Sequence, residues 1–149
     1  MSSQKVGSRM VDPYETIGFA LKQAQQALRT RLDSGLRQIE LTTPQYAVLT
    51  FLESDPGASN AALARRAYVT PQTMQAILVT LERAGLIART PHPELGRVQT
   101  TELTINGRKT LEAATGIVAE AEARLRNASA PLDPQMVTAM LRRLADALR

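Results

Sequence analysis

Apolar residues recur every three or four positions over residues 13–38, which is the spacing of one face of an α-helix. Charged and amide residues occupy the opposite side of this pattern. Asp12 is suited to cap such a helix, and Pro13 is suited to its first turn. We therefore predict a long amphipathic helix over 13–38. Its apolar stripe consists of Ile17, Leu21, Ala24, Leu28, Leu32, Leu36 and Ile39.

Two threonine–proline pairs predict the starts of further helices, because a hydroxyl caps a helix and proline suits its first position. The helix that begins at Thr43-Pro44 is apolar on more than one side, which predicts that it is buried, and it ends before Asp55. The helix that begins at Thr70-Pro71 runs to about Ala84, and Gly85 stops it.

A short helix over about 60–67 is predicted between these two, with Ser59 as its cap. Only a few residues then connect it to the helix that starts at Thr70-Pro71. Two short helices joined in this way form a helix-turn-helix, whose second helix enters the major groove of DNA. The alternative is an ordinary α-hairpin with a polar, solvated face.

The pattern changes after Gly85 from helical to strand-like. Residues 86–89 form a short strand-like run, 90–96 are rich in Pro and Gly, and 97–103 alternate and favour β-structure. These segments predict a two-stranded hairpin with a long loop. The hairpin is either a wing that reaches DNA or a cover for the core.

Two helices are predicted after the hairpin. Thr104 caps the first, over about 105–127, and Asp133-Pro134 starts the last one. The stripe of the first is weak and consists of Leu111, Thr115, Val118, Glu122 and Leu125. The stripe of the last consists of Val137, Met140, Leu141, Leu144 and Leu148. The expected fold class is mainly α with a small β-hairpin wing, a winged helix-turn-helix with long N- and C-terminal helices.

The positive charge of the chain is confined to its middle third. The chain has 149 residues and a net charge of +4, and residues 56–110 hold seven Lys or Arg against three Asp or Glu. The segments on either side are each neutral. This distribution either marks a surface for a polyanion such as DNA or is an accident of a small count.

Several classes of function are excluded or disfavoured by composition. The chain has no Cys, which excludes disulfides and thiolate metal sites, and its single His92 has no cluster of carboxylates beside it. The sequence has no Gly-rich phosphate-binding loop and no recognisable pair of catalytic carboxylates. We therefore expect that the protein is not an enzyme and binds no cofactor or metal. No apolar run could cross a bilayer, and residues 1–12 resemble a flexible polar tail without a signal core. We expect a cytoplasmic protein.

Short polar side chains occupy the outward face of the helix that starts at Thr70-Pro71. If Met74, Ile77, Leu78 and Leu81 face the core, then Gln72, Thr73, Gln75 and Ala76 face outward. Gln can pair with adenine, and the Thr methyl can touch thymine. The helix start at Thr70 also favours a phosphate.

Basic residues surround this helix in the sequence. Arg89 and Arg97 flank the loop of the hairpin, and His92 lies within that loop between two prolines. Arg65 and Arg66 end the shorter helix. We expect the wing residues to contact DNA and the paired arginines to contact phosphate, the alternative for each being simple solvation.

The chain resembles the MarR family of bacterial transcription regulators over nearly its whole length. The most specific parts are the Leu-Glu-Arg-Ala-Gly-Leu-Ile-Ala-Arg stretch of residues 81–89 and Leu103-Thr104-Ile105-Asn106-Gly107. The resemblance implies an obligate homodimer that binds palindromic double-stranded DNA. It also implies a small aromatic or anionic effector that weakens DNA binding from a cleft between the two regions. The aromatic candidates for that cleft are Phe19, Tyr46, Phe51 and Tyr68, for most of which core packing is the alternative.

Two departures from the family pattern concern DNA contact. Family wings usually carry Asp-x-Arg, in which the Asp orients the arginine, whereas this chain has Leu95-Gly96-Arg97 and Glu94 is out of register by one. The helix over 71–84 carries Ala76 and Thr80 where family members often have arginine. We therefore expect T/A-rich half-sites.

The pattern predicts a DNA-binding regulator with a single domain over 13–149, and the resemblance to the MarR family implies a ligand-responsive repressor. Residues 43–104 form its winged helix-turn-helix, and residues 13–42 and 105–149 form its dimerisation helices. The apolar faces of the terminal helices exceed what one small lobe can cover, so we expect a dimer interface there rather than an internal core. The alternative function is a helical adaptor whose winged helix binds another protein.

Overall fold

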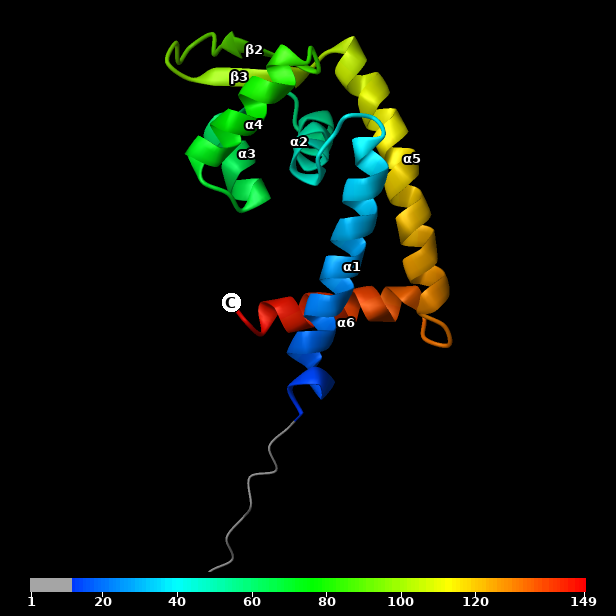
Figure 1. Ribbon diagram of the computed structural model, residues 1–149. Coiled ribbons are helices and arrows are strands. Elements are labelled where there is room, and N and C mark those ends of the chain that lie inside the picture. Colours follow the sequence, from blue (N-terminus) through cyan, green and yellow to red (C-terminus); the bar gives the residue numbers. More distant parts are fainter. Residues whose placement is uncertain (1–11) are drawn as a thin grey trace, which may run out of the picture.

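The structure, a computed structural model, describes residues 12–149 and is mainly helical (Figure 1). The predicted tail therefore lies outside the described residues, apart from Asp12. The helices are η1 (Pro13–Glu15), α1 (Ile17–Arg37), α2 (Thr43–Ser54), α3 (Asn60–Ala67), α4 (Pro71–Arg83), α5 (Ile105–Ala128) and α6 (Pro134–Asp146). The strands are β1 (Ala58–Ser59), β2 (Ile87–Pro91) and β3 (Gln99–Leu103).

Two of the predicted helix starts are displaced. The first predicted helix begins instead with the short turn η1, and α1 starts after Thr16, whose hydroxyl accepts a hydrogen bond from the Phe19 amide at 3.1 Å. The cap of α2 is Thr42 rather than Thr43. Its hydroxyl accepts from the Gln45 amide at 3.2 Å, and the Gln45 side chain accepts from the Thr42 amide at 3.0 Å. This reciprocal capping box selects Thr42.

The predicted hairpin is part of a small antiparallel sheet. β3 pairs with β2 and also with β1, so the strand order is β1-β3-β2. The sequence pattern missed β1, because a strand of two residues is too short to show alternation. β2 extends into the predicted loop as far as Pro91, which is tolerated at the end of an edge strand.

The core lies where α2, α3 and α4 pack against one another and against the base of the sheet. Leu49, Leu63 and Leu78 are completely buried there. α1 and α5 extend away from this core and run side by side (Figure 1). Arg31 of α1 forms an ion pair with Glu120 of α5 at 2.7 Å. Gly35 permits the close approach, because a Cβ there would lie 2.5 Å from Cγ2 of Ile117. α6 lies at the end of the molecule far from the sheet.

The buried stripe of α5 differs from the predicted one. Leu111 is buried as expected, but Ala114 and Ala121 complete the stripe, while Thr115 and Leu125 are exposed. These small buried side chains are compatible with the packing of α5 against α1 and α2. Among residues 12–149, no helix combines the length and the apolar character that a membrane span requires.

Candidate nucleic-acid interface

The helix-turn-helix is built from α3 and α4 and a connection of three residues. The Ser59 hydroxyl caps α3 by accepting from the Ala62 amide at 3.2 Å. Tyr68 ends α3 in a left-handed conformation, with φ 55°, and its side chain is exposed. Thr70 then caps α4, its hydroxyl accepting from the Thr73 amide at 3.1 Å. Backbone hydrogen bonds from the Tyr68 and Val69 amides to carbonyls of α3, together with these local caps, fix the conformation of the turn.

The two faces of α4 are the ones expected from the sequence. Met74, Leu78 and Leu81 are buried, and Ile77 is partly buried. The outward residues of the first turns are exposed, namely Gln72, Thr73, Gln75 and Ala76. The amino-terminal half of α4 thus offers amides, a hydroxyl and a methyl group to a partner, and these groups are suited to base edges.

Gln75 differs from its exposed neighbours because its side chain is bonded within the protein. Its amide oxygen accepts from Arg89 Nη1 at 3.0 Å and from Asn60 Nδ2 at 3.3 Å. Asn60, the first residue of α3, was not singled out from the sequence. It lies 15 residues from Gln75 along the chain, so no spacing pattern connects the two.

Arg89 is not the open cation expected at the base of the wing. Only 10% of its side chain is exposed, and its Nη2 is 3.3 Å from a carboxylate oxygen of Glu82. Glu82 lies near the end of α4 and Arg89 lies in β2, so this ion pair joins the helix to the wing. The structure therefore gives Arg89 an internal role, and the expected direct contact with DNA would require it to leave both partners.

The wing loop is organised by His92. Its Nδ1 accepts hydrogen bonds from the backbone amides of Glu94 and Leu95, both at 3.1 Å. Its own amide donates to the Val98 carbonyl at 2.6 Å. The ring folds back on its own loop, so the structure supports a local structural role beside the predicted contact with DNA.

Arg97 is the exposed cation of the wing. Within residues 12–149 its side chain forms no hydrogen bond or ion pair, so Glu94 does not replace the missing aspartate of the family pattern. Arg97 lines a hollow of about 470 Å³ between the wing and α4, together with Asn60, Gln75 and Arg89. A free guanidinium at this place is suited to a phosphate or to the minor groove.

The two arginines of α3 have different surroundings. Both are exposed, but the guanidinium of Arg66 lies 4.5 Å from the ring centre of Phe51 and reaches the Ser54 hydroxyl at 3.4 Å. Arg65 has no side-chain bond within the described part of the chain. Arg65 is therefore the less restrained of the two cations.

Comparison with known proteins identifies the family of this chain. A model of the MarR family matches residues 41–98, the span from α2 to the wing. The HTH-type transcriptional repressor Rv2887 of Mycobacterium tuberculosis is 38% identical over 109 residues, covering 73% of this chain and 78% of the repressor. This chain belongs to the MarR family. It is a transcription regulator and not an enzyme, because the members of the MarR family are transcription regulators.

Solved structures of MarR-family regulators agree with the fold. The repressor CouR bound to a 23-mer DNA duplex superimposes with a TM-score of 0.79 and 32% identity, covering 91% of this chain and 94% of CouR. CouR bound to p-coumaroyl-CoA gives a TM-score of 0.79 and 29% identity, covering 93% and 97% of the two chains. The same architecture thus occurs with DNA and with a ligand.

The MarR-like Leu-Thr-x-x-Gly stretch has a physical basis in this chain. The Thr104 hydroxyl donates to the Gly85 carbonyl at 2.6 Å and accepts from the Gly107 amide at 3.0 Å. Gly107 itself lies against the Leu86 carbonyl, where a Cβ has no room. These residues fasten the start of α5 to the end of α4 and therefore set where the wing begins.

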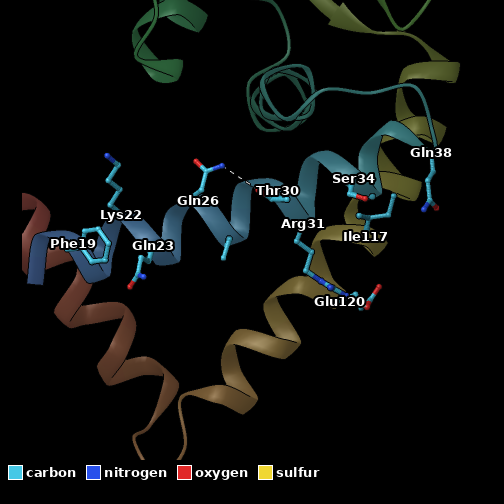
Figure 2. Close-up of a pocket in the computed structure, with 12 residues that line it drawn as sticks. Phe19, Lys22, Gln23, Gln26, Thr30, Arg31, Ser34, Gln38, Ile117 and Glu120 are labelled. Carbon is cyan, nitrogen blue, oxygen red and sulfur yellow. Dashed lines mark hydrogen bonds and ion pairs between the residues drawn. The ribbon is translucent and has the colours of Figure 1, made fainter. Parts of the chain in front are cut away.

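The four aromatic ligand candidates do not share a pocket. Phe19 lines a cleft of about 990 Å³ along α1 and α5, which also presents Lys22 and Arg31 (Figure 2). Tyr46 and Phe51 pack against the core, which was the alternative role given for them from the sequence. Tyr68 is 85% exposed and lies outside the core formed by the described residues. The structure of residues 12–149 therefore does not bring the four residues together in one cleft, and their role in binding an effector stays a prediction.

A second cleft lies where α1 meets the helix-turn-helix. It has a volume of about 700 Å³ and lies between the end of α1, the start of α2 and the exposed side of α4. Arg37 and Arg29 line it from α1, and Thr73 and Ala76 line it from α4. Arg29 is 3.7 Å from Asp33, whereas Arg37 has no ion pair within residues 12–149.

Proposed function

We propose that this chain binds duplex DNA as a homodimer at a palindromic operator and represses transcription from it, acting in the cytoplasm. The observation that carries the proposal is the amino-terminal half of α4, which offers short polar side chains beside a wing with a free Arg97. CouR, of the same architecture, has been solved on a DNA duplex, which supports this choice of partner.

Binding to labelled random duplex at low salt, followed by selection from a random library, tests DNA binding. We expect affinity that falls with salt and a selected palindrome whose half-sites are about one helical turn apart. Gln72→Ala on α4 should weaken specific binding about tenfold or change the selected bases, since one good base contact is worth about 1–3 kcal/mol.

The control for Gln72 is another exposed glutamine, Gln26 of α1, which lies outside the winged helix (Figure 2). Gln26→Ala should leave both affinity and selected sequence unchanged. If the wild-type chain ignores duplex DNA at low salt, or if both variants behave alike, the proposed interface is wrong.

The homodimer is supported by α6. None of its residues is buried, although Met136, Met140 and Leu141 point an apolar face outward. Leu148, just after the helix, is 85% exposed. A helix of this kind needs a partner surface, because the burial of its apolar face supplies most of its stability. A second copy of the chain, joined at the end far from the sheet, would leave both α4 helices free for DNA.

Sedimentation velocity of two neighbouring substitutions tests the dimer. Met140→Glu places a charge in the apolar face of α6 and should shift the chain to a monomer. Ala139→Glu adds the same charge on the opposite side of the helix and should leave the dimer intact. If both variants remain dimeric, the interface lies elsewhere, and if the wild-type chain is a monomer, the homodimer is refuted.

The proposed effector is a small aromatic acid or its coenzyme A thioester, and we place it in the cleft between α1 and α4. Arg37 offers an unpaired positive charge, and Thr73 and Ala76 of α4 form the opposite wall. A ligand in this cleft contacts α4 itself and can therefore change how α4 meets DNA. A ligand in the cleft along α1 and α5 does not contact α4 and cannot do so directly. CouR has been solved with p-coumaroyl-CoA, which supports this ligand class.

DNA release by p-coumarate and by p-coumaroyl-CoA, measured by fluorescence anisotropy, tests the effector and its position. Arg37→Ala should reduce the release by at least tenfold in ligand concentration, because it removes the charge that pairs with the ligand anion. Lys22→Ala, in the cleft along α1 and α5, is the matched control and should release DNA normally. The opposite result would move the effector to that other cleft, and no response to either probe would refute the ligand class.

A further inference from the structure

The amide of Gln75 has a fixed orientation on the outward side of α4. Two donors converge on its oxygen, Arg89 Nη1 at 3.0 Å and Asn60 Nδ2 at 3.3 Å. An amide oxygen has two lone pairs, so both are occupied. The Gln75 side chain is nevertheless exposed, which leaves its NH2 group for a partner.

Arg89 determines which end of the amide faces outward. A guanidinium can donate hydrogen bonds but cannot accept them, so only the oxygen of Gln75 can face it. Rotating the amide by half a turn would bring its NH2 group against the guanidinium and against the Asn60 NH2. Glu82 holds Arg89 from the other side at 3.3 Å, and only 10% of the Arg89 side chain is exposed. The arrangement therefore persists when α4 is free of DNA.

The geometry points to Gln75 as a donor-only reader of the major groove, with Arg89 as the residue that positions it. This inference rests on the proposed DNA binding. Bidentate pairing with adenine needs an oxygen acceptor as well as an NH2 donor on the same glutamine, and the oxygen is already used. The NH2 group can still donate to adenine N7, but adenine places a second donor beside that atom, and thymine offers O4 alone. Only guanine offers two adjacent acceptors, N7 and O6. Guanine is the better match, which departs from the T/A-rich half-sites expected from the sequence.

Selection from a random duplex library with a set of variants tests the inference. Gln75→Ala identifies the base position concerned, as the one whose preference is lost. At that position the wild-type chain should prefer guanine over adenine by about tenfold, the value of one good contact. Arg89→Met frees the amide to rotate and should bring adenine within about threefold of guanine.

Two further variants separate positioning from general effects. Arg83→Met removes the same charge from an exposed arginine at the end of α4 and should leave the base preference unchanged. Gln75→Glu can keep a bond to Arg89 with one oxygen and present the other to DNA. Because a carboxylate only accepts hydrogen bonds, this variant should change the preference to adenine or cytosine. It also leaves Arg89 in place, so it provides a folded variant for the test if Arg89→Met does not fold.

The outcomes are distinguishable from those of the proposed function. If the wild-type chain selects no sequence, DNA reading itself fails. If it selects an operator but prefers adenine at the Gln75 position, only the donor-only reading is overturned. An unchanged preference in a folded Arg89→Met variant refutes the positioning role of Arg89, and an unchanged preference in Gln75→Glu refutes base reading by Gln75.

Discussion

Replacing Gly107 by alanine would place a new carbon against the backbone where the wing meets α5. The added Cβ would lie 3.0 Å from the Leu86 carbonyl carbon and closer still to its oxygen. Neither atom can move easily, because the same oxygen accepts a hydrogen bond from the Thr104 amide at 3.1 Å. The substitution must therefore displace the start of α5 from the end of α4.

The expected destabilisation follows from these contacts. Overpacking a close-packed site costs about 1–3 kcal/mol. Weakening the bond between Thr104 and Leu86 adds about 1 kcal/mol. We therefore expect Gly107→Ala to lower the free energy of unfolding by about 2–4 kcal/mol. For a chain of this size that corresponds to a fall in melting temperature of about 6–12 °C.

Gly116 provides a matched control in the same helix. A Cβ at Gly116 meets nothing within 4 Å, and the residue is exposed. Gly116→Ala should raise the free energy of unfolding by about 0.5–1 kcal/mol, because alanine is the better helix former. Urea unfolding followed by circular dichroism measures both. If Gly107→Ala is as stable as Gly116→Ala, the close contact with Leu86 does not determine the position of α5.

Three shorter predictions concern other parts of the molecule. Arg97→Ala should weaken binding to all duplexes alike and reduce the slope of log affinity against log salt by about one, measured by anisotropy; a change confined to one sequence would contradict a phosphate contact. The hydrogen bond from Arg31, its charge and the nearby Arg124 lower the pKa of Glu120 below its ordinary 4.5, so Glu120 supports folding above that pH. Glu120→Gln should therefore lower the melting temperature at pH 7, and the gap should close as the pH falls below 4.5; a gap independent of pH would refute the ion pair. Leu78→Ala should cost about 2–5 kcal/mol in urea unfolding because its side chain is fully buried, and a smaller loss would mean that the core relaxes.

The helices were predictable because nearby residues in the sequence determine both their apolar stripes and their N-terminal caps. Thr70 and Asp133 are caps as expected, and each is followed by proline. Thr42 was missed because two threonines precede Pro44, and the choice between them depends on Gln45 reaching back to the Thr42 amide. The stripe of α5 was misjudged because Ala114 carries little hydrophobic signal, although it is completely buried.

The site was predictable as a region but not as a set of bonds. The exposed and buried faces of α4 follow from helical periodicity, so Gln72 and Thr73 could be placed outward from the sequence. The bond between Gln75 and Arg89 spans 14 residues and depends on how the sheet returns beside α4. No local pattern contains that information, which is why Arg89 was expected to be a free cation.

The absence of any buried residue in α6 has a consequence for how much of this regulator a cell must make. If the apolar face of α6 is covered only by a second copy, folding and association are one equilibrium, and stability rises with protomer concentration. At low expression the separated chains expose methionine and leucine side chains and become substrates for proteases and chaperones. Abundance then falls more steeply than synthesis, so a modest drop in expression empties the operator sharply.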